Sequence, residues 1–90
     1  MKHSKQDTIT NLKKAQSHTA KIIQMVEDDE YCVNIMQQNL AVIGLLKSAH
    51  QKLMENHLNT CFKDAMTSKN NSKQQKMIEE ILRVTKLSNK

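Results

Sequence analysis

The sequence predicts an all-α protein of three helices, with a long helix in the middle. The chain of 90 residues contains one Gly and no Pro, whereas small sheet-rich domains need many turn residues. Over most of the chain, apolar residues recur at the i, i+3, i+4 and i+7 spacing of an amphipathic helix. The length favours a single domain, residues 1–90, and the polar residues 1–7 are expected to form a disordered tail.

The first helix is predicted from about Thr8 to Glu27. Its stripe at helical spacing consists of Ile9, Leu12, Thr19, Ile22, Ile23 and Val26. An acidic run, residues 27–30, follows and indicates a junction. We expect Asp28 or Asp29 to cap the next helix, because short polar side chains accept hydrogen bonds from the free N–H groups of a helix start.

The second helix is predicted from Glu30 or Tyr31 to Met66. Gly44 has no polar turn residue beside it, so close helix packing within an unbroken helix is expected there. The main stripe consists of Val33, Met36, Leu40, Ile43, Leu46, Leu53, Leu58 and Ala65, and it is widened by Val42, Leu45 and Ala49. A stripe this wide predicts burial against more than one neighbour, as in a subunit interface.

The polar segment 67–72 predicts a loop, with Ser72 as the N-cap of a third helix from about Lys73 to Lys86. Only 38% of the residues are hydrophobic and 2% are aromatic, so one copy can bury only a thin core. Chains of this size are usually stabilised by a metal, a disulfide or a partner chain. We therefore expect an oligomer.

The net charge and the expected cellular compartment limit the classes of function that the chain could have. The formal net charge is +5, and the lysines gather towards the two ends of the chain. Such a surface suits a polyanion such as nucleic acid, although a solvated lysine-rich surface is the alternative. The N-terminus has no signal-peptide pattern, and no apolar run approaches the ~20 residues that span a membrane. A cytoplasmic protein is expected, in which paired thiols are more often metal-binding or reactive than disulfide-bonded.

Cys32, His57 and Cys61 form the candidate site. His57 and Cys61 stand at i and i+4, which places both on one helix face. On a continuous helix Cys32 and Cys61 would be roughly 43 Å apart at ~1.5 Å per residue. They can then meet only between two antiparallel copies, unless the chain forms a hairpin at Gly44. The alternative is that both cysteines are buried apolar residues.

Two thiolates and one imidazole are soft ligands. Such a set selects Cu(I), and Zn(II) competes where a fourth ligand is available.

Several short segments together resemble one known family. They are Tyr31-Cys32, Gln37, Ala41-Val42, Lys47-Ser48-Ala49 and His57-Leu58-Asn59-Thr60-Cys61. This pattern, over about residues 11–87, resembles the copper-sensing repressors (CsoR), which are related to the nickel sensor RcnR and the formaldehyde sensor FrmR. The resemblance implies an all-α fold and antiparallel dimers that pair into tetramers. It also implies that the protein binds operator DNA without a helix-turn-helix, and that metal binding weakens the complex with DNA.

The same resemblance implies roles for individual residues. Cys32 of one subunit with His57 and Cys61 of another would be the Cu(I) ligands. Tyr31 and Glu80 would lie around them and couple ligation to the DNA-binding surface. The residues expected to contact operator DNA are Lys13, Lys14 and Lys47.

The chain also departs from the family pattern. Where relatives often have Arg-Ile-Glu-Gly-Gln, this chain has Lys14-Ala15-Gln16-Ser17-His18, and Lys lacks the bidentate hydrogen bonding of Arg. Cys61 argues against the formaldehyde branch and His57 against the persulfide branch. His3 is a candidate extra nitrogen ligand for a nickel sensor.

The sequence therefore predicts a repressor that binds operator DNA without metal and leaves it on binding Cu(I). A thiol- or persulfide-responsive repressor, a nickel sensor, and a copper carrier without a DNA role remain alternatives. An enzyme is not expected, because no Gly-rich loop, oxyanion donors or acidic dyad accompanies the Cys–His pair.

Overall fold

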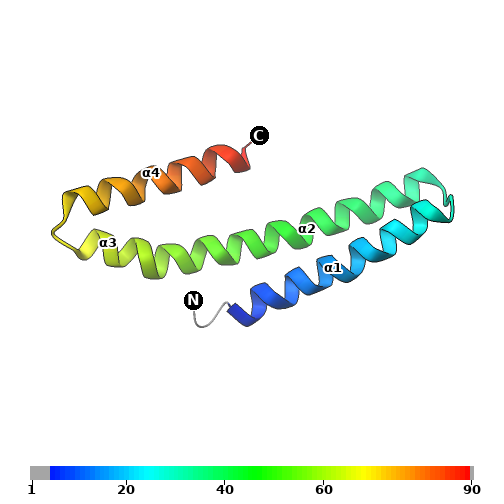
Figure 1. The fold of residues 1–90 in the computed structure, drawn as a ribbon, viewed down its shortest axis with the longest axis horizontal. Coiled ribbons are helices and arrows are strands. Elements are labelled where there is room, and N and C mark those ends of the chain that lie inside the picture. The colour runs from blue at the N-terminus through cyan, green and yellow to red at the C-terminus, as the bar shows by residue number, and fades with distance from the viewer. Residues whose placement is uncertain (1–4, 90) are drawn as a thin grey trace. The chain divides into compact units, whose positions relative to one another are not determined.

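The structure, a computed structural model, describes residues 5–89 and is all-α, as predicted (Figure 1). These residues contain no β-strand. The elements in order are α1 (Lys5–Glu27), α2 (Cys32–His57), the π-helical turn η1 (Leu58–Phe62), α3 (Lys63–Thr67) and α4 (Asn71–Ser88). The predicted long middle helix corresponds to α2, η1 and α3, which follow one another without a break. The chain divides into two compact units, one up to Asn56 and one from His57.

Helix α1 begins earlier than predicted, whereas its end at Glu27 is as predicted. Residues 5–7, which we expected in the tail, form the first turn of α1, and residues 1–4 lie outside the described part. At the other end, Asp29 adopts a left-handed conformation with φ 54°. The Asp29 N–H donates to the Val26 carbonyl (3.1 Å) and the Glu30 N–H to the Met25 carbonyl (3.0 Å). This pair of bonds is a Schellman motif, with Asp in the position usually taken by Gly.

The acidic run therefore ends α1, and the prediction that Asp28 or Asp29 caps α2 is wrong. The carbonyl of Tyr31 instead accepts hydrogen bonds from the N–H groups of Asn34 (3.0 Å) and Ile35 (3.3 Å). Helix α2 accordingly begins at Cys32.

In the first unit, α1 and α2 form an antiparallel hairpin (Figure 1). The buried residues of its seam are Thr8, Ala15 and Met25 from α1, and Val42 and Ala49 from α2. Two polar pairs cross the seam: Asn11 donates to the Ser48 hydroxyl (2.9 Å), and His18 lies 2.6 Å from the Gln38 amide oxygen. Alanines in the seam allow close approach, and the polar pairs fix one register because any slip leaves them unsatisfied.

Most of the apolar stripe predicted from the sequence lies outside this seam. The exposed large apolar side chains of α1 and α2 are Leu12, Ile23, Val26, Val33, Met36, Leu40, Ile43, Leu46 and Leu53. Gly44 lies inside an unbroken α2, as predicted, but a Cβ there would meet nothing within 4 Å. The expected close packing at Gly44 is therefore absent from the chain itself. No helix among the described residues is long and apolar enough to cross a membrane.

In the second unit, the loop between α3 and α4 is shorter than predicted. Helix α4 begins at Asn71, and its N-cap is Asn70, whose side chain accepts from the Lys73 N–H at 3.1 Å. The predicted N-cap, Ser72, is wrong, because that residue already lies inside the helix. The Gln74 side-chain amide donates to the Ser68 carbonyl (2.7 Å) and to the Met66 carbonyl (3.4 Å). These bonds hold the first turn of α4 against the end of α3.

We expect Asn70→Ala to destabilise the protein by about 1 kcal/mol, the usual cost of losing an N-cap side chain. In thermal unfolding this corresponds to a Tm lower by roughly 4–8 °C. Protein concentration must be fixed, because oligomerisation shifts Tm. Asn71→Ala, at the next and exposed position, is the matched control and should change Tm little. Equal losses in both variants would rule out the capping role.

Candidate functional site

His57 and Cys61 lie where the α-helical winding of α2 gives way to η1. His57 is the last residue of α2 and Cys61 lies within η1, whose wider winding is marked by a hydrogen bond from the Lys63 N–H to the Leu58 carbonyl. On an α-helix, four residues turn the chain about 40° beyond a full turn. The wider winding of η1 changes this offset between the two side chains. Such turns occur frequently at functional sites.

The imidazole of His57 has a partner that the sequence did not predict. His57 is half-buried, and its Nε2 lies 3.1 Å from the Sδ atom of Met77 on α4. Cys61 is a free, exposed cysteine, and its Sγ accepts a hydrogen bond from the Thr60 hydroxyl at 3.7 Å. The thiol and the Nδ1 side of the imidazole are the groups that this segment can offer to a metal.

Cys32 lies at the start of α2, also as a free and exposed cysteine. Both cysteines are exposed in the single chain, so neither is buried within its own core. The continuity of α2 through Gly44 excludes a hairpin there. Within residues 5–89 of one chain, no three His, Cys, Asp or Glu side chains are grouped so as to hold a metal ion.

The two residues expected around the metal are differently placed. Tyr31, just before α2, is 67% exposed. Glu80 is half-buried and lines a surface hollow on α4 with Lys76, Glu79 and Arg83. Its carboxylate has cationic neighbours at i−4 and i+3 on the same helix face. The hydrogen-bond partner of His57 in this structure is Met77, one turn before Glu80.

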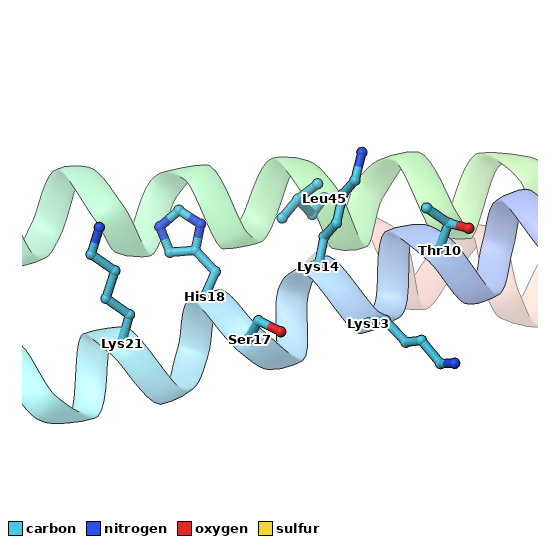
Figure 2. Close-up of a pocket in the computed structure, with 7 residues that line it drawn as sticks. All are labelled: Thr10, Lys13, Lys14, Ser17, His18, Lys21 and Leu45. Carbon is cyan, nitrogen blue, oxygen red and sulfur yellow. The ribbon is translucent and has the colours of Figure 1, made fainter.

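A basic hollow runs along α1 (Figure 2). Its lining consists of Thr10, Lys13, Lys14, Ser17, His18 and Lys21 from α1, and Leu45 from α2. Figure 2 shows the ammonium groups of Lys14 and Lys21 on the α2 side of α1 and that of Lys13 extending away from it. Hydroxyl and ammonium donors gathered along α1 in this way suit the phosphates of a nucleic-acid backbone.

The structure thus brings two of the three predicted DNA-contacting lysines, Lys13 and Lys14, together. Lys47 is exposed on α2 and is not among the residues that line the hollow. Lys21 belongs to the hollow but was not predicted to contact DNA. Its spacing of seven residues from Lys14, two helical turns, is the signal that could have identified it.

Comparisons with known proteins agree on one family. The family model described as metal-sensitive transcriptional repressor matches residues 4–86. The copper-sensing transcriptional repressor CsoR of Mycobacterium ulcerans (strain Agy99) is 36% identical over 84 residues, covering 93% of this chain and 69% of that protein. CsoR of Bacillus subtilis (strain 168) is 41% identical over 63 residues, covering 69% of this chain and 62% of that protein.

A solved structure of a copper-sensing repressor has the same fold as this chain. The copper-sensing repressor CsoR with Cu(I) from Geobacillus thermodenitrificans NG80-2 superimposes with a TM-score of 0.86 and 26% identity. The match covers 100% of this chain and 91% of that chain. By its sequence and by its fold, the chain belongs to the metal-sensitive transcriptional repressor family.

Proposed function

We propose that this protein is a copper-responsive transcriptional repressor, which binds operator DNA in the absence of Cu(I) and is released when Cu(I) binds. The observation that carries the proposal is the donor set, two exposed free thiols and one imidazole, in a chain whose relatives are named copper-sensing repressors. Soft donors of this kind fit Cu(I). Each site would take Cys32 from one copy and His57 and Cys61 from another.

The exposed apolar side chains of α1 and α2 support an oligomer. A monomer gains nothing by leaving so many large apolar side chains in water, because each of them forgoes the transfer free energy of burial. We infer an antiparallel homodimer that buries this surface, and a pairing of dimers into a tetramer. Two-fold pairing also gives two equivalent copies of the proposed metal site.

The basic hollow supports the DNA role. Lys13 and Lys14, with Lys21 beside them and Lys47 on α2, would neutralise phosphates, and the released counterions would supply much of the affinity. Such a protein regulates transcription rather than catalysing a reaction, and it would act in the cytoplasm, where its operator lies. Bound Cu(I) would link side chains of two subunits, and DNA and metal would weaken one another's binding by the same factor.

We expect His57→Ala to bind DNA as well as the wild type but to lose release by copper. Coupling free energies of this kind correspond to roughly 10- to 100-fold changes in affinity, so Cu(I) should weaken wild-type DNA binding by about that factor and leave the variant unchanged. The measurement is fluorescence anisotropy with a DNA fragment selected from random sequence by the copper-free protein. His50→Ala, an exposed histidine of α2, is the control. Normal copper release from His57→Ala would refute the coupling scheme.

A thiol-responsive repressor is the second candidate, because both cysteines are exposed and free. In that case peroxide oxidises the Cys32 and Cys61 thiols of two chains to a disulfide and is itself reduced to water, or an inorganic polysulfide supplies already oxidised sulfur for the bridge. Mass spectrometry of the intact protein detects either product. A copper carrier would bind Cu(I) but show no salt-dependent DNA binding. A nickel sensor would recruit His3, which lies outside the described residues.

A further inference from the structure

The contact between His57 and Met77 has only one consistent hydrogen-bonding pattern. A thioether sulfur carries no hydrogen and can only accept. The Nε2 atom, 3.1 Å from the Met77 Sδ, must therefore carry the imidazole proton. In a neutral imidazole this leaves the lone pair on Nδ1, which becomes the nitrogen available to a metal.

We propose that Met77 is a positioning residue of the metal site: its thioether accepts the Nε2–H of His57 and so presents Nδ1 to Cu(I). The inference rests on the proposed copper function and adds to it a residue on α4 with a defined task. Ligating histidines generally need a partner for the second ring nitrogen, because that bond fixes the tautomer and the ring orientation.

The local structure holds Met77 in place for this task. The side chain of Gln74, three residues earlier on α4, is bonded to the Ser68 and Met66 carbonyls. The Asn70 cap fixes the start of the same helix. Met77 and His57 are both half-buried, so water competes less for the contact than it would at a fully exposed pair. A shift of α4 would therefore move the acceptor of the His57 imidazole directly.

A carboxylate would be a stronger partner, but the structure gives the His57 imidazole a thioether instead. Glu80 lines its own hollow with Lys76 and Arg83. Met77 offers a neutral and weaker acceptor. We therefore place its effect on metal affinity at the lower end of the range for such outer partners, about ten-fold.

The test compares Met77→Leu, which keeps the apolar volume but removes the acceptor, with Met77→Gln, which restores an acceptor of similar reach. Met66→Leu, a methionine of α3 that makes no side-chain bond to His57 in this structure, is the matched control. Cu(I) affinity is measured anaerobically with a competing chelator. We expect about ten-fold weaker binding in Met77→Leu, near-wild-type binding in Met77→Gln, and no change in Met66→Leu.

Two readouts separate positioning from other roles. In the copper-free wild type, nuclear Overhauser effects should connect the Met77 methyl group with the His57 ring protons. In the copper-loaded protein, X-ray absorption should count the same number of sulfur ligands in the wild type and in Met77→Leu. A sulfur ligand missing from Met77→Leu would overturn the proposal and make Met77 a direct ligand.

The binding measurements distinguish a wrong role for Met77 from a wrong copper function. If wild-type protein binds Cu(I) and depends on Cys32 and Cys61, but Met77→Leu binds equally well, only the role of Met77 is refuted. If wild-type protein does not bind Cu(I) tightly at all, the copper function fails as well. Unchanged melting temperatures in the variants exclude a general loss of structure as the cause of weaker binding.

Discussion

Mixing a Cys32→Ala variant with a Cys61→Ala variant should restore Cu(I) binding that neither variant has alone. In either homodimer, both sites lack one thiolate. In a mixed dimer, one site receives Cys32 from the Cys61→Ala chain, and His57 and Cys61 from the Cys32→Ala chain. That site is complete, whereas the other lacks both thiolates.

The expected size of this effect is large. Each single variant should lose tight Cu(I) binding, because one soft ligand of three is gone. With random exchange of subunits in an equimolar mixture, about half the dimers are mixed, so about one tight Cu(I) is expected for every four chains. The measurement is anaerobic titration against a competing chelator.

The control is a chain that carries both substitutions, mixed in the same way with Cys32→Ala. No dimer in that mixture contains a complete site, so binding should remain absent. Native mass spectrometry confirms that subunits have exchanged. Full exchange without restored binding would refute the shared site, and tight binding by either variant alone would refute the ligand set.

Replacing Lys13 and Lys14 with Gln should weaken DNA binding by about a hundred-fold at moderate salt. Each lysine that neutralises a phosphate contributes about one unit to the slope of log K against log salt. Removing both ammonium groups should therefore flatten that slope by about two for each chain that touches DNA. The measurement is anisotropy over a series of salt concentrations, with the DNA selected by the copper-free protein.

A control with the same change in net charge shows whether location matters. Lys63 and Lys69 are both exposed, belong to the second unit, and are not among the residues that line the basic hollow. Replacing this pair with Gln should cost far less. Equal weakening by the two double variants would mean that DNA binding follows the overall charge of +5 rather than the α1 surface.

The sequence alone predicted which segments are helical. The reason is that helix formation depends on local information: the spacing of apolar residues, one Gly, no Pro, and polar residues at the junctions. The family was also predictable, because the spacing of Cys32, His57 and Cys61 is a property of the sequence. The errors lie at helix ends. Ser72 and Asp29 are both suitable helix caps by residue type. Which polar residue actually caps a helix depends on the geometry of the neighbouring turn.

Which side of each helix faces its neighbour could not be predicted, because it depends on how the helices pack against one another. Several faces of α2 are apolar, and the periodicity does not say which one the same chain covers. In the structure, the seam takes Ala15, Val42 and Ala49, and it leaves Leu40 and Ile43 exposed. The pairing of His57 with Met77 was also beyond the sequence, since it joins residues of two helices. Contacts of this kind depend on the conformation of the loop between the two helices. The helix propensities of the residues do not determine that conformation.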